Sequence, residues 1–296
     1  MHCLNLKLTY KCTNNCSFCF SSYLKDEIIS TKGLFQAVER GSEYGCNELV
    51  LSGGEPTTCP DKLCGILSFA AEHGYKKYII QSNGSGIAEN AELTNYIRRF
   101  AVNNDLTISF SVHGHTAKIH DTMSQTPGAF DKLMKAIAII STTTNCGIYT
   151  NTVISSLNID HLKDIWDLLQ PYHPVIIQYS MMHLEKSGEM STGLLEAAAA
   201  VRAMKTYVDL DILKTEGIPY CLMYGMEQCV GESCWPNELD LYNKNEDYMR
   251  DFNQLEDGMR WKRDDCSKCI MNEICSGIWK EHAEEFAKSS IHPIEA

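Results

Sequence analysis

The chain has 296 residues, of which 44% are apolar and 22% are charged, a composition typical of a globular protein with one extensive core. Its net charge of −12 argues against a nucleic-acid substrate, because an acidic surface repels a phosphate backbone, and favours a neutral or cationic one. The longest apolar run is too short to span a bilayer, and the N-terminus lacks the basic and apolar regions of a signal peptide. We therefore expect a cytoplasmic protein without a membrane segment.

Strands and helices are predicted to alternate from the start of the chain to about residue 210. The first strand shows the pattern clearly, because Leu4, Leu6 and Leu8 recur at period two. The predicted strands are 3–10, 47–54, 76–84, 106–114, 146–155 and 175–184, and the predicted helices are 33–45, 60–74, 88–101, 127–142, 158–172 and 192–211.

Six such units indicate βαβ connections and a parallel sheet. They are too few for a closed eight-stranded barrel, so an open partial barrel is the alternative to a doubly wound sheet. In both folds, ligands bind at the C-terminal ends of the strands. After about residue 210 the alternation stops and Gly, Asn, Cys and acidic residues become frequent. We expect a barrel domain at 1–209 and a small cysteine-rich domain at 210–296 that bound metal would stabilise.

The 14 cysteines point to metal or redox chemistry, because disulfide frameworks are rare in a reducing cytosol. One cluster, CTNNCSFC, directly follows the first predicted strand and brings Cys12, Cys16 and Cys19 to the C-terminal rim. A structural zinc site or a closed iron–sulfur cluster takes four protein ligands. Three thiolates on a four-iron cluster would leave one iron open to a substrate or cofactor. Zinc is the alternative interpretation of the spacing.

The second predicted strand ends in SGGEP, with Gly53, Gly54 and Glu55 in sequence. A glycine pair at a strand end lets backbone groups approach a small ligand closely, and the Glu55 carboxylate is an acceptor for an ammonium group. A plain tight turn is the alternative. Because the C-terminal ends of adjacent parallel strands lie at one edge, the glycine pair and the cysteine cluster together indicate one shared ligand.

The combination of CTNNCSFC and GGEP resembles the radical S-adenosylmethionine (radical SAM) superfamily over roughly residues 2–205. The resemblance implies an α/β fold with a partial (β/α)6 TIM-like barrel, in which the three cysteines hold a [4Fe–4S] cluster. SAM would chelate the open iron through its amino and carboxylate groups. One electron from the cluster, supplied by a flavodoxin- or ferredoxin-type donor, would split SAM into methionine and a 5′-deoxyadenosyl radical that abstracts hydrogen from the substrate.

The resemblance also assigns SAM contacts to residues outside the cysteine motif. These are Phe18 against the adenine, Gly53, Gly54 and Glu55 at the amino group, Asn83 and Ser111 at the ends of the third and fourth strands, and Asn151 and Val153 at the ribose and adenine. The family's glycine-containing fifth-strand motif is not evident in TNTVISSLN, so the last two assignments depend on position alone. His113, in SVHG, is a candidate catalytic residue that contacts SAM or substrate; capping the barrel is its alternative role.

A second cluster, CSKCIMNEIC, contains Cys266, Cys269 and Cys275. Its spacing looks like the auxiliary-cluster region of the SPASM and twitch subfamilies of radical SAM enzymes. The fourth ligand there usually comes from upstream, where Cys221 is best placed. Four thiolates would close a second [4Fe–4S] cluster, with a zinc ribbon as the alternative. No cysteine follows Cys275, so we expect one auxiliary cluster, as in the twitch version.

The sequence indicates the roles of the other cysteines less clearly. Cys229 and Cys234 are candidate catalytic residues, because a thiol is a good hydrogen-atom donor; they are alternatively ligands, a redox pair or loop cysteines without a role. The remaining five are expected to be small, mostly core residues, namely Cys3, Cys46, Cys59, Cys64 and Cys146.

Twitch and SPASM enzymes mostly modify peptides or proteins, so the resemblance implies crosslinking, epimerisation or oxidation of a peptide substrate. Oxidation or rearrangement of a small molecule in cofactor or natural-product biosynthesis is the alternative. Because the first strand begins at once, without a peptide-binding extension, we expect a peptide to be presented by a separate recognition protein. An iron–sulfur electron carrier is the non-enzymatic alternative, but a carrier needs neither GGEP nor six barrel units.

Overall fold

A computed structural model describes residues 2–19, 21–183, 190–234, 237–241, 250–251 and 258–295, and for residues 2, 233–234, 237–241 and 250–251 it describes the backbone alone. The strands are β1 (His2–Thr9), β2 (Cys46–Gly53), β3 (Lys77–Ser82), β4 (Asp105–Ser111), β5 (Cys146–Val153), β6 (Ile176–Ser180), β7 (Leu213–Glu216), β8 (Asn237–Leu241), β9 (Arg250–Asp251), β10 (Arg260–Trp261) and β11 (Ile278–Trp279). The helices are α1 (Thr31–Glu43), α2 (Pro60–Glu72), α3 (Ser85–Glu89), α4 (Ala91–Asn103), α5 (Ala117–Ser124), α6 (Ala129–Ser141), α7 (Leu162–Leu169), α8 (Leu194–Ala203) and α10 (Ala283–Ala287).

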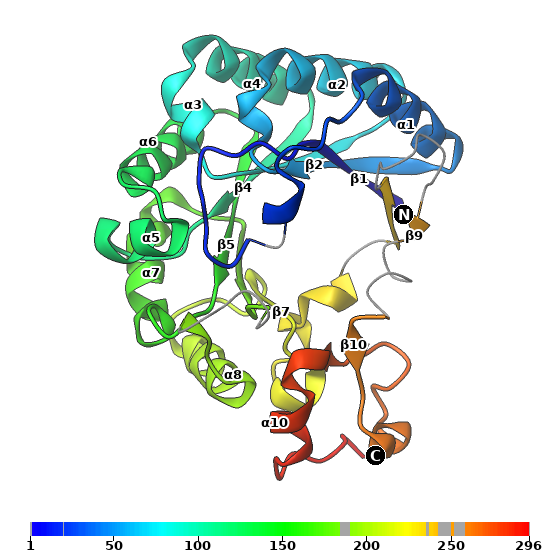
Figure 1. Ribbon diagram of the computed structural model, residues 1–296, viewed down its shortest axis with the longest axis vertical. Coiled ribbons are helices and arrows are strands. Elements are labelled where there is room, and N and C mark those ends of the chain that lie inside the picture. Colours follow the sequence, from blue (N-terminus) through cyan, green and yellow to red (C-terminus); the bar gives the residue numbers. More distant parts are fainter. Residues whose placement is uncertain are drawn as a thin grey trace.

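Strands β1 to β7 form a parallel sheet in chain order, each hydrogen-bonded to the next. At the β1 edge, β8 pairs in parallel with β1, and β9 pairs antiparallel with β8. The sheet curves, and the helices α1 to α8 lie along its outer side (Figure 1). This arrangement confirms the predicted α/β fold with a partial, TIM-like barrel.

The two faces of the strands differ in chemistry. Leu4, Leu6 and Leu8 of β1 are fully buried and belong to the core under the helices. Burying a leucine side chain of this kind stabilises the fold by about 1.5–3 kcal/mol. On the opposite face, the Ser52 hydroxyl of β2 donates a hydrogen bond of 2.8 Å to Asn5 Oδ1. The concave side of the sheet is therefore partly polar, which suits a ligand.

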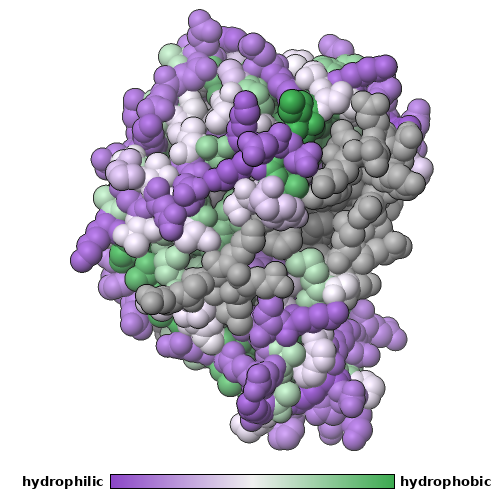
Figure 2. Space-filling model, viewed as in Figure 1, coloured by the Kyte–Doolittle hydropathy of each residue, from purple (hydrophilic) through white to green (hydrophobic). Residues whose placement is uncertain are grey.

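The face of the molecule seen in Figure 2 is largely polar, in agreement with the net charge of −12. Figure 2 shows hydrophilic residues along the outer margins of the visible face, with apolar residues in smaller groups between them. In the part of the chain that the structure describes, no helix combines the length and the hydropathy that a bilayer span requires.

The segment after residue 209 contributes more to the core than the sequence predicts. Strand β7 extends the sheet beside β6, and Ile218 and Met223 are buried in a second apolar cluster with α8. Trp279 and Phe286, near the C-terminus, belong to the same cluster. These apolar residues follow no regular period, because much of the segment forms short 3-10 turns, so the sequence suggested a stretch without a core.

Candidate active site

The cysteine loop between β1 and α1 is attached to the end of β2 by main-chain contacts. The Gly54 N–H donates to the Thr9 carbonyl at 2.6 Å, and the Glu55 N–H donates to the Lys11 carbonyl at 2.8 Å. Gly53 adopts a φ of 129°, and a Cβ there would lie 2.2 Å from the Thr9 carbonyl oxygen. A Cβ at Gly54 would lie equally close, 2.2 Å, to the Lys11 oxygen. The glycine pair thus allows the GGEP segment to lie directly against the start of the cysteine loop.

The three thiols of this loop are partly buried and electrostatically coupled. Cys12 Sγ accepts a hydrogen bond from the Asn14 N–H at 3.4 Å. Burial, with a smaller contribution from the neighbouring Cys12 and Cys19 thiols, raises the pKa of Cys16 to about 12. Burial also raises the pKa of Cys12. Neighbouring thiolates are stable together only beside a strong positive charge, so this donor set fits an iron–sulfur cluster.

Glu55 is the most enclosed acidic residue of the site, with 1% of its surface exposed. Its Oε1 accepts hydrogen bonds from the Thr57 N–H at 3.1 Å, the Thr57 hydroxyl at 2.7 Å and the Ser82 hydroxyl at 2.8 Å. Its Oε2 accepts from the Asn83 N–H at 2.6 Å. Burial raises the pKa of Glu55, and these four hydrogen bonds oppose the rise. The carboxylate thus links the ends of β2 and β3 by hydrogen bonds, and these contacts fix the position of the two strand ends at the rim.

Asn83 connects the end of β3 to the cysteine loop. Its Nδ2 donates to the Thr13 hydroxyl at 2.9 Å and lies 3.7 Å from Cys12 Sγ. Ser111, the last residue of β4, is paired with Asn151 of β5. The structure thus places the predicted residues of the third, fourth and fifth strands at the same rim as the cysteines.

The buried His113 ring packs against the half-buried Phe18 ring. The two rings meet edge to face with centroids 4.9 Å apart, and His113 is 4% exposed. Burial, with a smaller contribution from the neighbouring His120 ring, lowers the pKa of His113 to about 3. The Val153 N–H donates to His113 Nδ1 at 3.4 Å, so the proton of the neutral ring is on Nε2. His113 therefore supports the Phe18 ring, and its lowered pKa favours the neutral imidazole over the imidazolium.

A polar group lies on the concave side of β5 to β7, and of its members only Asn151 was singled out from the sequence. Glu216 Oε2 accepts from Gln178 Nε2 at 3.0 Å and lies 2.6 Å from the Ser180 hydroxyl, which is also 2.7 Å from Asn151 Oδ1. The Tyr149 hydroxyl donates to Gln178 Oε1. The alternation of these polar side chains at period two on β5 and β6 was a signal that could have identified them.

A buried ion pair lies next to this polar group. Arg260 Nη2 is 3.3 Å from Glu232 Oε1, and the Arg260 guanidinium lies 3.4 Å from the centre of the Trp279 ring. Glu232 Oε1 also accepts from the Gly217 N–H at 2.7 Å, whereas Glu232 Oε2 has no hydrogen-bond partner among the described residues. Burial raises the pKa of Glu232 to about 7, and Arg260 opposes this rise. The pair links the end of β7 to the C-terminal segment.

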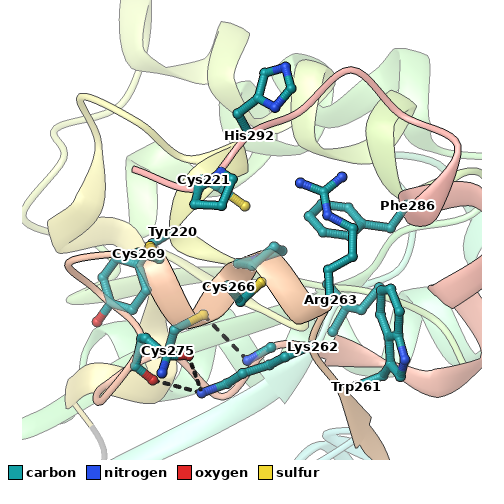
Figure 3. Close-up of a pocket in the computed structure, with 15 residues that line it drawn as sticks. Tyr220, Cys221, Trp261, Lys262, Arg263, Cys266, Cys269, Cys275, Phe286 and His292 are labelled. Atoms are coloured by element: carbon teal, nitrogen blue, oxygen red, sulfur yellow. Dashed lines mark hydrogen bonds between the residues drawn. The ribbon is translucent and has the colours of Figure 1, made fainter. Parts of the chain in front are cut away.

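The four cysteines of the second predicted cluster line one pocket (Figure 3). Cys221 lies in the turn η8 (Tyr220–Leu222), Cys266 lies in η11 (Asp264–Lys268), and Cys269 and Cys275 follow. Burial raises the pKa of Cys221 to about 12, and the other three thiols add to the rise. The structure therefore brings together residues up to 54 positions apart in the sequence, in a donor set that fits a four-thiolate metal group.

Of the two cysteines that were candidate hydrogen donors, the structure describes the side chain of one. Cys229 is fully buried in the second apolar cluster, and its thiol lies 3.6 Å from the Leu210 carbonyl. This is the environment of a core residue, and we do not retain Cys229 as a candidate hydrogen donor. Cys234 ends the turn η10 (Gly231–Cys234), and its side chain lies outside the described residues. The five cysteines expected to be small core residues are buried or partly buried.

Comparison with known proteins matches residues 6–169 to the Radical SAM superfamily. The AdoMet-dependent heme synthase of Methanosarcina barkeri is 26% identical over 165 residues, which are 55% of this chain and 45% of the relative. The GTP 3′,8-cyclase of Pseudomonas putida is 30% identical over 95 residues, 30% of this chain and 28% of the relative. The chain thus aligns with less than half the length of each of these curated relatives.

Two solved structures resemble nearly the whole chain. Streptococcus suis SuiB bound to the precursor peptide SuiA has a TM-score of 0.68 at 14% identity and covers 100% of this chain and 75% of SuiB. The structure of anSMEcpe with AdoMet and the Kp18Cys peptide has a TM-score of 0.66 at 14% identity and covers 99% of this chain and 93% of anSMEcpe. At this level of identity, the likeness establishes a common fold.

Proposed function

Because the chain belongs to the radical SAM superfamily, we propose that it cleaves SAM reductively and abstracts hydrogen from a peptide or protein substrate. The observation that carries the proposal is the attachment of the cysteine loop to the GGEP segment, with hydrogen bonds of 2.6 and 2.8 Å at Gly54 and Glu55. When bound, the [4Fe–4S] cluster supplies the electron that splits SAM. The chain's own residues hold the cluster, orient SAM and enclose the substrate.

Cys12, Cys16 and Cys19 would hold the cluster and leave one iron open to SAM. A structural zinc ion takes four protein ligands, whereas a four-iron cluster held by three thiolates keeps one iron open. The count of three thiols in this loop therefore favours the iron–sulfur cluster.

The SAM molecule would lie across the rim formed by β2 to β5. Phe18, supported by His113, offers an aromatic surface to the adenine. The backbone at Gly53 and Gly54 would receive the amino group, because the Glu55 carboxylate, with about four lone-pair sites, already accepts four hydrogen bonds. Glu55 would then act by positioning the two strand ends.

A peptide substrate is supported by the chemistry of the concave face. Tyr149, Gln178 and Glu216 offer donors and acceptors there, which suit the amides of a peptide backbone. The net charge of −12 also favours a neutral or cationic substrate. SuiB and anSMEcpe, which share the fold, were each solved with a peptide.

A small-molecule substrate is the second candidate, because the names of the curated relatives refer to heme and GTP. An acidic chain is poorly suited to a triphosphate, so the charge of the protein favours the peptide. In both cases, we propose that Cys221, Cys266, Cys269 and Cys275 hold a second [4Fe–4S] cluster without an open iron, which exchanges electrons with the substrate.

The experiment is an anaerobic assay of the protein with reconstituted clusters, a chemical reductant and SAM. Release of 5′-deoxyadenosine is measured by mass spectrometry, with and without peptides encoded by short neighbouring genes. We expect slow release without peptide and faster release with the cognate peptide, together with deuterium transfer from labelled peptide to 5′-deoxyadenosine. No release would favour an electron carrier, and release that only a small molecule accelerates would favour the second candidate.

A further inference from the structure

Two histidines and an aspartate from two different loops meet at the rim of the barrel. His115 lies between β4 and α5, His161 ends the turn η3 (Ile159–His161), and Asp164 lies in the first turn of α7. One ligand atom from each lies within 4.8 Å of the other two. The two imidazole rings are 4.6 Å apart between centroids and inclined at 41°. Figure 1 shows α5 and α7 as neighbours on the outer side of the sheet.

A simple ion pair accounts for only part of this arrangement. His161 Nδ1 is 2.8 Å from Asp164 Oδ2, which is a normal hydrogen bond. His115 Nε2 is directed at the same oxygen from 4.0 Å, which is too far for a hydrogen bond. The other ring nitrogen, His115 Nδ1, is buried without a hydrogen-bond partner among the described residues. The His115 ring thus contacts the His161 ring, but among the described residues no hydrogen bond fixes it beside the carboxylate.

A metal ion would fill the gap between these groups. Nitrogen and oxygen ligands about 2.1 Å from one tetrahedral zinc ion lie about 3.4 Å from one another. The separations of 2.8 and 4.0 Å at Asp164 Oδ2 fall on either side of that value, so small side-chain rotations are sufficient.

We propose that His115, His161 and Asp164 form a binding site for a zinc ion, with water at the remaining position. Two imidazole nitrogens and one carboxylate oxygen are ligands that zinc commonly takes in proteins. The three side chains are 23%, 41% and 47% exposed, so an ion can enter from solvent. The site is separate from both cysteine sets and does not depend on the proposed substrate.

Such an ion would crosslink the loops that support the predicted adenine side of the active site. His113, two residues before His115, packs against Phe18. Asn158, three residues before His161, donates from Nδ2 to the carbonyls of His113 and Val153, each at 2.9 Å. The zinc ion would add a second connection between the same two loops, farther out at the surface, and would act as a structural support of this rim.

The test uses the protein with its iron–sulfur clusters in place and zinc as the probe. Zinc affinity is measured by competition with a chromophoric chelator for the wild type, Asp164→Asn and Asp167→Asn. Asp167 is the matched control, because it lies on the same helix and pairs with Lys163 at 2.5 Å, outside the three-residue group. We expect one zinc site in the wild type, weakened at least about tenfold by Asp164→Asn and unchanged by Asp167→Asn.

A second measurement distinguishes this site from zinc bound by stray thiols. The double variant His115→Ala/His161→Ala should lose the zinc site, and hydrogen exchange at residues 113–116 and 158–164 should slow on zinc addition in the wild type alone. Equal zinc affinity in the wild type and Asp164→Asn would overturn the proposal, as would zinc binding that survives in the double variant. Asp164 is half-exposed and Asn has the same shape, so Asp164→Asn should fold. Its zinc affinity tests the proposal even if the double variant does not fold.

Discussion

The N-terminal cysteine loop takes its three thiols from residues 12–19, whereas the C-terminal pocket takes four thiols from positions between 221 and 275. The loop is attached to the parallel sheet through Gly54, Glu55 and Asn83. The pocket is bounded mainly by short turns and the two-residue strands β10 and β11. The first site is thus positioned by the fold, whereas we expect the second to need a bound metal group to hold its distant segments together.

The largest expected effect is the loss of the first site. Changing Cys12, Cys16 and Cys19 together to Ala should abolish SAM cleavage and remove about four irons per chain, because a four-iron cluster needs its thiolates. The fold should survive, since the core under α1 to α8 does not include these side chains. Iron analysis, circular dichroism and the 5′-deoxyadenosine assay check this. Persistent cleavage in the triple variant would contradict the assignment.

The second effect is confined to the C-terminal pocket. Changing Cys221, Cys266, Cys269 and Cys275 to Ala should lower the iron content from about eight to about four per chain, keep SAM cleavage and stop product formation. Hydrogen exchange should rise in residues 258–295, because metal binding there contributes to folding. Residues 213–230 should stay protected, since they pack on α8 and β6. Zinc in place of iron in the wild type would reduce the pocket to a structural role.

A smaller effect is expected at the carboxylate that joins β2 and β3. Glu55→Ala leaves three buried donors and the half-buried Asn83 N–H without their acceptor, and each buried donor costs about 1–3 kcal/mol if it stays unpaired. We expect a lower melting temperature and SAM affinity reduced at least about tenfold, measured by calorimetry. Glu89→Ala is the control, because its ion pair with Lys132 is exposed and contributes little. Equal effects of the two changes would show that Glu55 does not position the rim.

The smallest effect concerns pH and the link between the two regions. Burial raises the pKa of Glu232 to about 7, from an ordinary value of 4.5, so the folded protein binds more protons than the unfolded chain between these values. Stability from this group is present below about pH 4.5 and is lost as the pH rises towards 7. Glu232→Gln removes the titration, so the melting temperature of the wild type should fall relative to that of the variant between pH 5.5 and 7.5. A constant difference would mean that Arg260 keeps Glu232 ionised throughout.

The sequence alone predicted the features that depend on neighbouring residues. The alternation of Leu4, Leu6 and Leu8 predicts β1, and the order of strands and helices predicts the parallel, partial barrel. Cys12, Cys16 and Cys19 and the GGEP segment were recognisable because each motif is continuous in the chain. The grouping of Cys221 with three later cysteines followed from the resemblance and from its place upstream of them, and the structure brings all four to one pocket.

Only the tertiary structure decided the features that depend on contacts between distant residues. Strand β7 and the apolar turns after it have no period of their own, and they are stable because β6 and α8 cover them. Glu55 looked like a ligand for an ammonium group, but its direction is set by Ser82 and Asn83, 27 and 28 residues away. The approach of His115 to Asp164 likewise results from the packing of two βα units. Periodicity records which face of an element is buried, whereas the partner that a polar side chain meets there depends on the whole fold.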